Sequence, residues 1–164
     1  MFFTIRFSLD YMFYSQNLIF RRYTLDDFLL IKKLYQDWNW ENVDDDFAKK
    51  YLENVIFLQY EQEYAGLYAI FSKENMDYQG HCGVKYRDEE WHLSFRFLKT
   101  FWKNDAPVEV ITTSLKYVFS HLKPNEIVMH LDRKSKGASK MLLKSGLKHR
   151  FSMGEGEERY SVFL

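Results

Sequence analysis

The stretch Thr100–Val110, TFWKNDAPVEV, joins a strand-like run of residues to the clearest amphipathic helix in the chain. The run before it, EWHLSFRFL (90–98), is rich in the aromatic and branched residues that are typical of a strand. Asp105 can cap the helix and Pro107 is tolerated in its first turn. Because a helix N-terminus carries unpaired N–H groups and partial positive charge, the stretch is either an anion-binding loop or only a turn. The apolar residues that predict the helix are Val108, Ile111, Leu115, Val118, Phe119 and Leu122.

The rest of the chain predicts a sheet with flanking helices. A strand at 17–23 leads into a helix at 24–38, which Thr24 can cap and Asp27 can support from its third position. A second helix is predicted over 44–62, since apolar residues recur there at helical spacing, namely Phe47, Tyr51, Val55 and Leu58. The other predicted elements are strands at 66–72, 80–86, 90–98 and 126–131, helices at 106–122 and 136–146, and closing strands at 147–153 and 158–164. The predicted order is β α α β β β α β α β β.

Composition excludes several classes of protein. The 164 residues suit a single domain, 1–164, with its own core, and 19% of them are aromatic. Lys plus Arg balances Asp plus Glu at 23 each, which argues against nucleic acid as a partner. The single Cys82 allows no internal disulfide and suits a reducing compartment. Arg6 and Asp10 interrupt the apolar first 16 residues, which we interpret as an N-terminal extension of a cytoplasmic protein that does not enter a membrane.

Several stretches of the sequence also carry a resemblance to a known family. They are LIFRRYTLDD (18–27), GHCGV (80–84), FRFLKTFWKNDAPVEV (95–110), KGASKMLLKSGL (136–147) and YSVFL (160–164). Over residues 17–164, their order and spacing resemble the GNAT superfamily of acyl-CoA-dependent N-acyltransferases, and in particular its ribosomal-protein N-terminal acetyltransferase-like (RimJ/RimL-like) branch. The resemblance implies an α+β fold of three α/β layers, in which a mixed and mostly antiparallel central sheet is flanked by helices. The family positions are filled by Trp102, Glu109, Ser139, Lys144 and Gly146.

The resemblance implies acetyl-CoA as co-substrate and direct transfer of its acetyl group to a primary amine. The residues expected to contact the coenzyme are Phe97, Leu98, Trp102, Lys103, Asn104, Asp105, Ala106, Val108, Lys136 and Lys140. The loop departs from the family pattern, since Lys103 and Asp105 replace its two glycines and Pro107 replaces a small residue. These changes remove an N–H donor and add a carboxylate. The loop is therefore either a weakened coenzyme site or a helix cap, and the alternative function is that of a non-catalytic GNAT-fold domain that binds a ligand or partner.

Two residues are candidates for proton transfer. The strand position that many family members fill with a proton-relaying Glu is His92 here, and a neutral imidazole can serve as that base. Its simpler interpretation is a polar residue on the outward face of a strand, and Glu89 and Glu90 are the next candidates for the base. The family's usual helix Tyr is missing, which leaves the Ser139 hydroxyl either as the acid for the leaving thiolate or as a helix cap.

Aromatic residues mark a candidate acceptor site. The resemblance implies that the junction holding Trp38 and Trp40 forms one wall of the acceptor cleft, where aromatic and acidic side chains would select a cationic amine. The alternative is a Trp pair that packs the helix connection. Tyr160 is expected either in the substrate cleft or in the interior. The acceptor is a small molecule or a protein N-terminus, and a homodimer is left open.

A basic stripe adds a last candidate site. Lys136, Lys140 and Lys144 follow one another at spacings of four, so they share a helix face and call for an anion or for open water. The anion would be the 3′-phosphate of the coenzyme or, as an alternative, RNA or an acidic protein. No metal is expected, because the run Asp44–Asp46 lacks the spaced ligands and turn glycine of a calcium loop.

Overall fold

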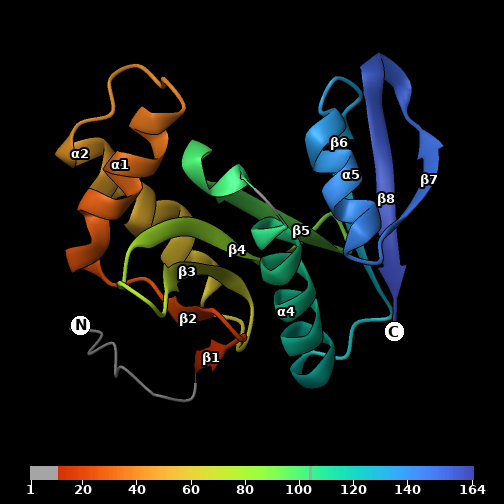
Figure 1. Cartoon of the computed structure of the whole chain (residues 1–164), viewed down its shortest axis with the longest axis horizontal. Helices are drawn as coiled ribbons and strands as arrows, with labels where there is room; N and C mark the ends of the chain where they lie inside the picture. Colours follow the sequence, from red (N-terminus) through yellow and green to blue (C-terminus); the bar gives the residue numbers. More distant parts are fainter. Residues whose placement is uncertain (1–10, 104) are drawn as a thin grey trace.

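The computed structural model of the chain describes residues 11–103 and 105–164, and its centre is one eight-stranded sheet (Figure 1). The strand order is β1-β2-β3-β4-β5-β6-β8-β7. Every neighbouring pair is antiparallel except β5 and β6, which run parallel. The strands are β1 (Met12–Tyr14), β2 (Leu18–Arg22), β3 (Gly66–Ser72), β4 (Tyr78–Arg87), β5 (Glu90–Phe97), β6 (Glu126–Asp132), β7 (Lys148–Ser152) and β8 (Glu157–Phe163).

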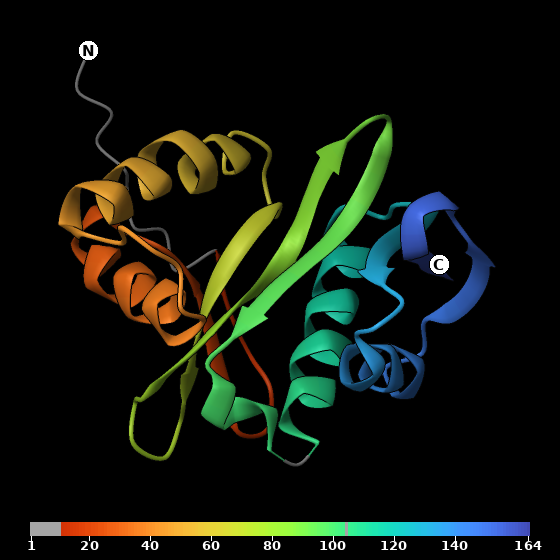
Figure 2. The same ribbon diagram turned by 90° about the horizontal axis from the view of Figure 1, so that it is seen from above.

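Helices cover both faces of this sheet, as Figure 2 shows from above. One buried cluster packs α4 (Ala106–His121) and α5 (Lys136–Lys144) against the sheet. The second cluster lies on the opposite face, under α1 (Phe28–Asp37), α2 (Asp45–Tyr51), the π-helix η3 (Leu52–Ile56) and the short helix α3 (Phe57–Gln59). Short 3₁₀ turns complete the chain at η2 (Leu25–Asp27), η4 (Lys99–Trp102) and η5 (Gly154–Gly156). The predicted three-layer α+β fold, with a mixed and mostly antiparallel sheet, is confirmed.

Each predicted strand and helix is present, and one further strand precedes them. β1 pairs with β2 and comes from the stretch that the sequence analysis assigns to an N-terminal extension. Residues 1–10 of that stretch lie outside the described residues. β1 has only three residues, so its sequence shows too little alternation to be recognised as a strand. No helix in the described part of the chain combines the length and the apolar character needed to cross a membrane.

The predicted apolar face of the second helix is wrong in its second half. The chain winds as a π-helix over η3, so that each turn there takes more residues than an α-helix does. The buried side chains are therefore Leu52 and Ile56, whereas Val55 and Leu58 are 39% and 58% exposed. A strict 3.6-residue period cannot anticipate this rotation of the face.

The start of α1 is fixed by Asp27, as its position in the sequence predicts. Its Oδ2 accepts a hydrogen bond of 2.8 Å from the Thr24 N–H, and both carboxylate oxygens accept from the Arg21 guanidinium, at 2.7 and 2.9 Å. Burial acts to raise the pKa of Asp27, but the hydrogen bonds from Arg21 and Thr24 outweigh it and hold the pKa below the usual value. The ionised carboxylate thereby joins β2 to the first turn of the helix.

Two glycines of β4 allow the central strands to approach closely. A Cβ atom built on Gly83 would lie 1.9 Å from the carbonyl oxygen of Gly66 in β3. One built on Gly80 would lie 2.2 Å from the carbonyl oxygen of Arg96 in β5. The stretch GHCGV is thus required by the packing of the strand backbones on which the candidate site is built.

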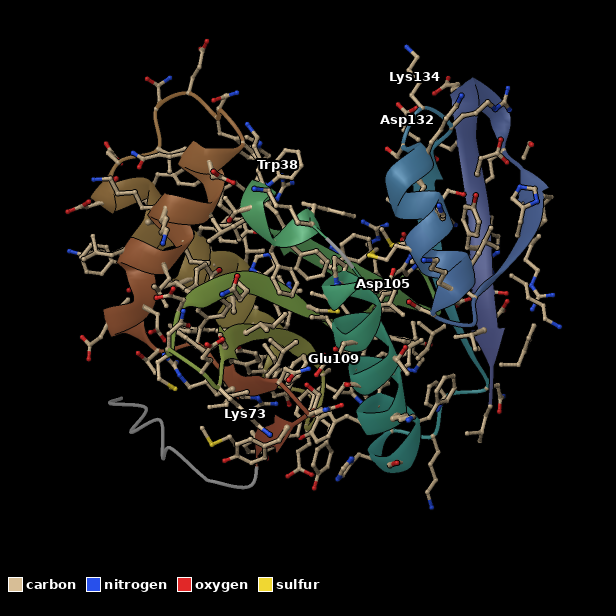
Figure 3. All side chains as sticks on the ribbon, in the orientation of Figure 1. Trp38, Lys73, Asp105, Glu109, Asp132 and Lys134 are labelled. Atoms are coloured by element: carbon tan, nitrogen blue, oxygen red, sulfur yellow. The ribbon has the colours of Figure 1, made fainter. Side chains whose placement is uncertain are left out.

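Glu109 fastens the first turn of α4 to the β1–β2 hairpin (Figure 3). Its Oε1 accepts hydrogen bonds from the Ser15 hydroxyl at 2.5 Å and from the Asn17 N–H at 2.9 Å. Its Oε2 accepts from the side-chain amide of Asn17 at 3.0 Å. At this family position, the carboxylate therefore sets the direction in which the helix leaves the preceding loop.

Candidate active site

The candidate site lies where β5 and β6 part. Their parallel pairing is limited to Trp91 with Ile127 and His92 with Val128, and the strands then diverge (Figure 1). On its other side, β5 stays paired with β4 as far as Phe97, and the Leu98 N–H donates to the Gln79 carbonyl. Because backbone groups alternate between the two edges of a strand, Phe97 presents its carbonyl to the diverging side. In the described residues, this edge of β5 has no strand partner beyond His92.

Trp38 closes one end of this free edge. Its indole N–H donates a hydrogen bond of 2.8 Å to the Phe97 carbonyl, which holds the end of α1 against β5. Figure 3 shows Trp38 at the same end of the molecule as Asp132 and Lys134, which lie across the separation of the two strands. The Lys99 ammonium lies 5.5 Å from the centre of a Trp38 ring. Trp38 therefore lies beside the free edge of β5, with its polar atom bonded within the protein itself.

His92 lies at the point where the two strands separate. It is 6% exposed, and its Nε2 is buried without a hydrogen-bond partner among the described residues. Its ring packs edge-on against His130 of β6, with centroids 5.5 Å apart. Burial lowers the pKa of His92, and the nearby charges of Arg87 and His130 lower it further. The side chain is thus a buried imidazole that is neutral at pH 7, and the simpler interpretation of His92 as a polar residue on the outward face of a strand is wrong.

Glu89 and Glu90, the two alternative candidates for the general base, are less well placed than His92 to accept a proton. Glu89 is exposed in the turn between β4 and β5, where its φ is 65°. Glu90 forms two hydrogen bonds with Arg159, at 2.7 and 3.1 Å, and these are the main reason why the pKa of Glu90 is lowered. A carboxylate held in this way accepts a further proton poorly.

Ser139 and Tyr160 form a hydroxyl pair on the opposite face of the sheet from Trp38. Their oxygens are 2.6 Å apart, and Tyr160 belongs to the core beneath α4 and α5. The pair opens into a cavity of about 220 Å³ between α5 and the ends of β6 and β8. Lys136 and Lys140 line the same cavity, together with Asp132, Arg133, Leu143 and Glu158. The structure therefore brings four of the predicted site residues together, although Tyr160 is not on the same side as the two tryptophans.

The loop before α4 only partly suits a pyrophosphate. The N–H groups of Val108 and Glu109 both donate to the Asp105 carbonyl, at 3.0 and 3.4 Å, and Pro107 has none. The first turn of the helix therefore has fewer free donors than a glycine-rich loop provides. In contrast, the Trp102 Nε1 is buried and has no partner among the described residues, so it is a donor that a bound group could satisfy. Asn104, also predicted to contact the coenzyme, lies outside the described residues.

The carboxylate of Asp105 is neutralised. The Lys144 ammonium lies 2.9 Å from its Oδ1, and the hydrogen bond from Lys144 is the main reason why the pKa of Asp105 is lowered. Asp105 therefore repels an anion less than the sequence suggests. Lys136 and Lys140 are exposed, and within the described residues neither has a carboxylate within 4.0 Å. No group of three or more metal-binding side chains is found in the part of the chain that the structure describes.

The sequence analysis missed Arg96 of β5. Its guanidinium carbon lies 5.0 Å from the centre of the Tyr35 ring and 5.2 Å from that of Trp40. Trp40 is 46% exposed and also packs edge-on against Tyr35, with ring centroids 4.6 Å apart. The alternation of EWHLSFRF could have identified Arg96, because it places this residue on the same strand face as His92.

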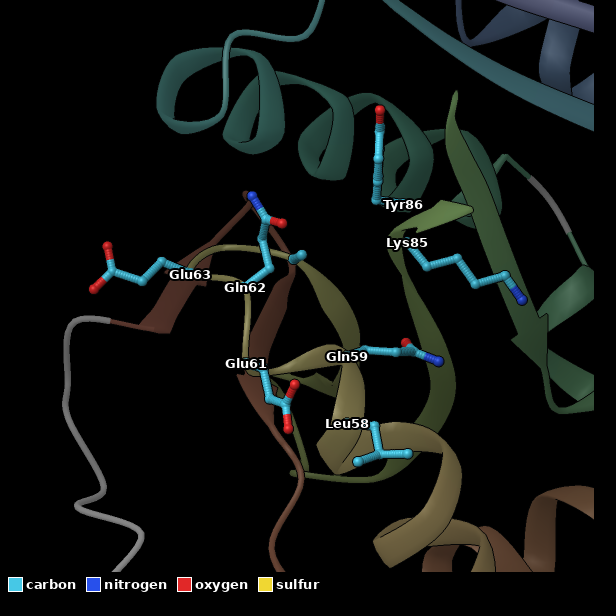
Figure 4. A pocket seen from close by; sticks show the side chains of 8 residues that line it. Leu58, Gln59, Glu61, Gln62, Glu63, Lys85 and Tyr86 are labelled. Carbon is cyan, nitrogen blue, oxygen red and sulfur yellow. The ribbon is translucent and has the colours of Figure 1, made fainter. Parts of the chain in front are cut away.

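A larger cavity of about 690 Å³ adjoins this face (Figure 4). It lies between the end of α3, the start of β3 and the end of β4, and its lining includes Gln59 and Lys85. Lys85 pairs across the strands with His92, so the two side chains share a face of the sheet. Figure 4 shows Gln59 and Lys85 extending in the same direction and Glu63 pointing away from them. None of the predicted site residues lines this cavity.

Comparisons with known proteins agree with this fold. The family model described as an acetyltransferase (GNAT) domain matches residues 17–148. No curated protein sequence matches the chain. Similar solved structures include RimL, a ribosomal L7/L12 alpha-N-protein acetyltransferase in complex with coenzyme A. It is 10% identical to this chain with a TM-score of 0.77, and the match covers 92% of this chain and 96% of that chain. The ribosomal-protein-S5-alanine acetyltransferase from Vibrio fischeri is 11% identical with a TM-score of 0.75, covering 93% and 96%. A variant of the spermidine N-acetyltransferase SpeG from Vibrio cholerae is 12% identical with a TM-score of 0.72, covering 91% and 95%.

Proposed function

Because the chain belongs to the acetyltransferase (GNAT) family, we propose that it transfers the acetyl group of acetyl-CoA directly to a primary amine. The observation that carries this proposal is the separation of β5 from β6 directly after His92. It leaves a free strand edge between a buried imidazole on one face and the Ser139–Tyr160 hydroxyl pair on the other. An amine and a thioester that approach this edge from opposite faces would meet beside both proton-transfer groups.

Proton transfer in this proposal uses His92 as the base and the Ser139–Tyr160 pair as the acid. Acetyl-CoA would supply the activated acetyl thioester. The neutral His92 imidazole has an unoccupied Nε2 and accepts the proton that the amine loses as its nitrogen forms the new bond. The Ser139–Tyr160 pair provides a hydroxyl proton for the departing thiolate. The free backbone edge of β5 orients the group that is transferred.

The binding residues lie on the α4 and α5 side of the sheet. Lys136 and Lys140 supply positive charge for phosphate groups, while the pairing with Lys144 reduces the repulsion from Asp105. The unpartnered Trp102 N–H supplies a buried donor beside the loop. The second candidate function, a non-catalytic domain with a GNAT fold, is favoured by the small number of free N–H groups at Pro107, Val108 and Glu109.

Transfer of a labelled acetyl group distinguishes these two functions. The protein would be incubated with acetyl-CoA and a panel of peptides with free α-amines and small diamines, and both the acetylated product and the released thiol would be measured. We expect the two to appear in equal amounts. Thiol release without any acetylated amine, or no release at all, would favour the non-catalytic function.

Replacing both Lys136 and Lys140 with alanine should remove the contribution of the coenzyme's 3′-phosphate to binding. Wild-type protein should bind CoA more tightly than 3′-dephospho-CoA, by about 3- to 30-fold if one charge-assisted contact is worth about 0.7–2 kcal/mol. The double variant should bind both ligands equally in a calorimetric titration. Lys116 on the exposed side of α4 is a matched control, since its replacement should leave the preference intact. A preference that persists in the double variant would place the phosphate elsewhere.

A further inference from the structure

Arg96 is a positive charge for which the described residues provide no counter-ion. No carboxylate in the described part of the chain lies within 4.0 Å of its guanidinium. Two other partly buried arginines are neutralised, Arg21 by Asp27 at 2.7 Å and Arg159 by Glu90 at 2.7 Å, whereas Arg22 is stacked on Tyr11 and Tyr60 without a carboxylate within 4.0 Å among the described residues. Lys85, on the same face of the sheet, also lacks a carboxylate within this distance. The face that carries His92 therefore holds two cations, Arg96 and Lys85, that have no carboxylate within 4.0 Å, while its carboxylate Glu90 is paired with Arg159 and lies 3.8 Å from the His92 Nε2.

The surroundings of Arg96 hold its guanidinium in place and leave its donors available. The stacking on Tyr35 and Trp40 uses the flat face of the group. Tyr35 is itself fixed, since its hydroxyl donates to the Tyr51 hydroxyl at 2.6 Å. Within 3.5 Å, no hydrogen bond from the Arg96 side chain is found among the described residues; a polar neighbour is the Tyr35 hydroxyl, whose pKa Arg96 acts to lower against the larger effect of burial. A guanidinium held by its face presents its N–H fork to a carboxylate in bidentate geometry.

This arrangement does not suit a cationic acceptor. The junction of Trp38 and Trp40, which was expected to select a cationic amine, already holds the Arg96 guanidinium, 5.2 Å from the centre of the Trp40 ring. A second positive charge placed there would be repelled by the guanidinium. An acceptor with a negative group would instead complete an ion pair that the chain leaves open. The positive charge of Arg96 would thus disfavour polyamines and favour acidic molecules at this position.

The distance from His92 to Arg96 indicates the size of the acceptor. The two residues lie four positions apart on one strand and share a face. Four residues of a strand rise about 13 Å, which the long arginine side chain can shorten or lengthen by several ångströms. An amine and a carboxylate that far apart require a few residues of extended chain, because a single amino acid is too short.

We propose that the acceptor is the α-amine of a polypeptide with an acidic side chain within its first few residues, and that Arg96 binds this side chain. This inference rests on the proposed acetyl transfer and names its substrate. Arg96 is a specificity-determining residue in this account, because it lies away from the reacting amine. Its loss should therefore raise KM for acidic peptides and leave kcat nearly unchanged.

The test uses peptides that differ only in the charge of one side chain. Sets with Asp, Asn or Lys at position two, three or four, and mixed neutral residues elsewhere, would be acetylated and quantified by mass spectrometry. Wild-type protein should have a kcat/KM about 10- to 100-fold higher for the best Asp peptide than for its Asn counterpart. Arg96→Gln should abolish this preference, and Arg96→Glu should reverse it in favour of Lys.

Matched controls separate the possible outcomes. Lys99→Gln removes an exposed cation from the same wall and should preserve the preference for Asp. Arg96→Lys keeps the positive charge but lacks the guanidinium's fork of N–H donors, so it should retain only part of the preference for Asp peptides. Equal use of Asp, Asn and Lys peptides by the wild-type protein, or faster use of free acidic amino acids or polyamines, would overturn this inference alone. Failure to acetylate any amine would overturn the proposed function and this inference with it.

Discussion

Replacing His92 with glutamine should lower kcat for acetyl transfer by about 10²- to 10⁴-fold, the usual contribution of a positioned general base. Glutamine keeps a polar group of similar size at the buried position but cannot take up a proton. The dissociation constant of acetyl-CoA should stay the same, because His92 lies on the opposite face of the sheet from Ser139 and the lysines. Steady-state kinetics and a calorimetric titration of the same protein preparation measure the two quantities.

The pH profile provides a second readout of the same role. Since the pKa of His92 is lowered, the imidazole stays neutral at pH values where an ordinary histidine is already protonated. In wild-type protein, kcat/KM should therefore begin to fall only below the usual histidine range, and this acidic limb should be missing from the residual activity of His92→Gln. His130→Gln is the control: it should keep the acidic limb, shifted to higher pH, because His130 packs against His92 and helps to lower its pKa without being the assigned base. Full activity in His92→Gln would show that another group accepts the proton.

Lowering the pH from 7 to 5 should reduce the free energy of unfolding by about 2 kcal/mol through His81 alone. His81 is 2% exposed and pairs through Nδ1 with the Tyr23 hydroxyl at 3.1 Å, and that hydroxyl lies 2.5 Å from the Tyr78 hydroxyl. Burial lowers the pKa of His81 to about 3, and the charge of Arg96 adds to this effect. The unfolded chain, with the ordinary value of 6.5, therefore binds more protons. The stability is complete above pH 6.5 and is lost progressively as the pH falls toward 3.

Urea denaturation at several pH values tests this prediction. The expected slope approaches about 1.4 kcal/mol per pH unit below the unfolded pKa. His81→Gln should flatten the slope between pH 7 and 5, whatever its effect on stability at pH 7. His92 is the second histidine whose pKa is lowered, so it also contributes to the pH dependence of the free energy of unfolding. His92→Gln removes that contribution, and the slope due to His81 should persist in this variant. An unchanged slope in His81→Gln would mean that the imidazole is not held neutral by its burial.

The elements that the sequence predicts well are those with a local signal. Asp27 can be recognised as a capping residue from its place after Thr24, and the structure shows its hydrogen bond to that residue. The apolar spacing in α4 likewise predicts its buried side, where Ile111, Leu115 and Val118 lie. In contrast, the π-helix of η3 leaves no periodic signal of its own, because it interrupts the very spacing that is used to find helices.

The candidate site depends more on contacts between distant residues. The pairing of Ser139 with Tyr160 joins residues 21 positions apart, and Lys144 reaches Asp105 over 39 positions. Neither pair is visible in local patterns, so the sequence overstates the adverse charge of Asp105. The stacking of Arg96 on Trp40 is likewise formed between elements far apart in the chain. It places a positive charge at the junction that was expected to select a cationic amine.

The most direct test of the central claim is a calorimetric titration of the wild-type protein with acetyl-CoA, accompanied by thermal unfolding in its presence. The account predicts saturable binding of one coenzyme per chain. At about 100 times its dissociation constant, the ligand should stabilise the fold by about 2.7 kcal/mol. The absence of both heat and stabilisation at millimolar acetyl-CoA would contradict the proposal that the separated edges of β5 and β6 bind this coenzyme.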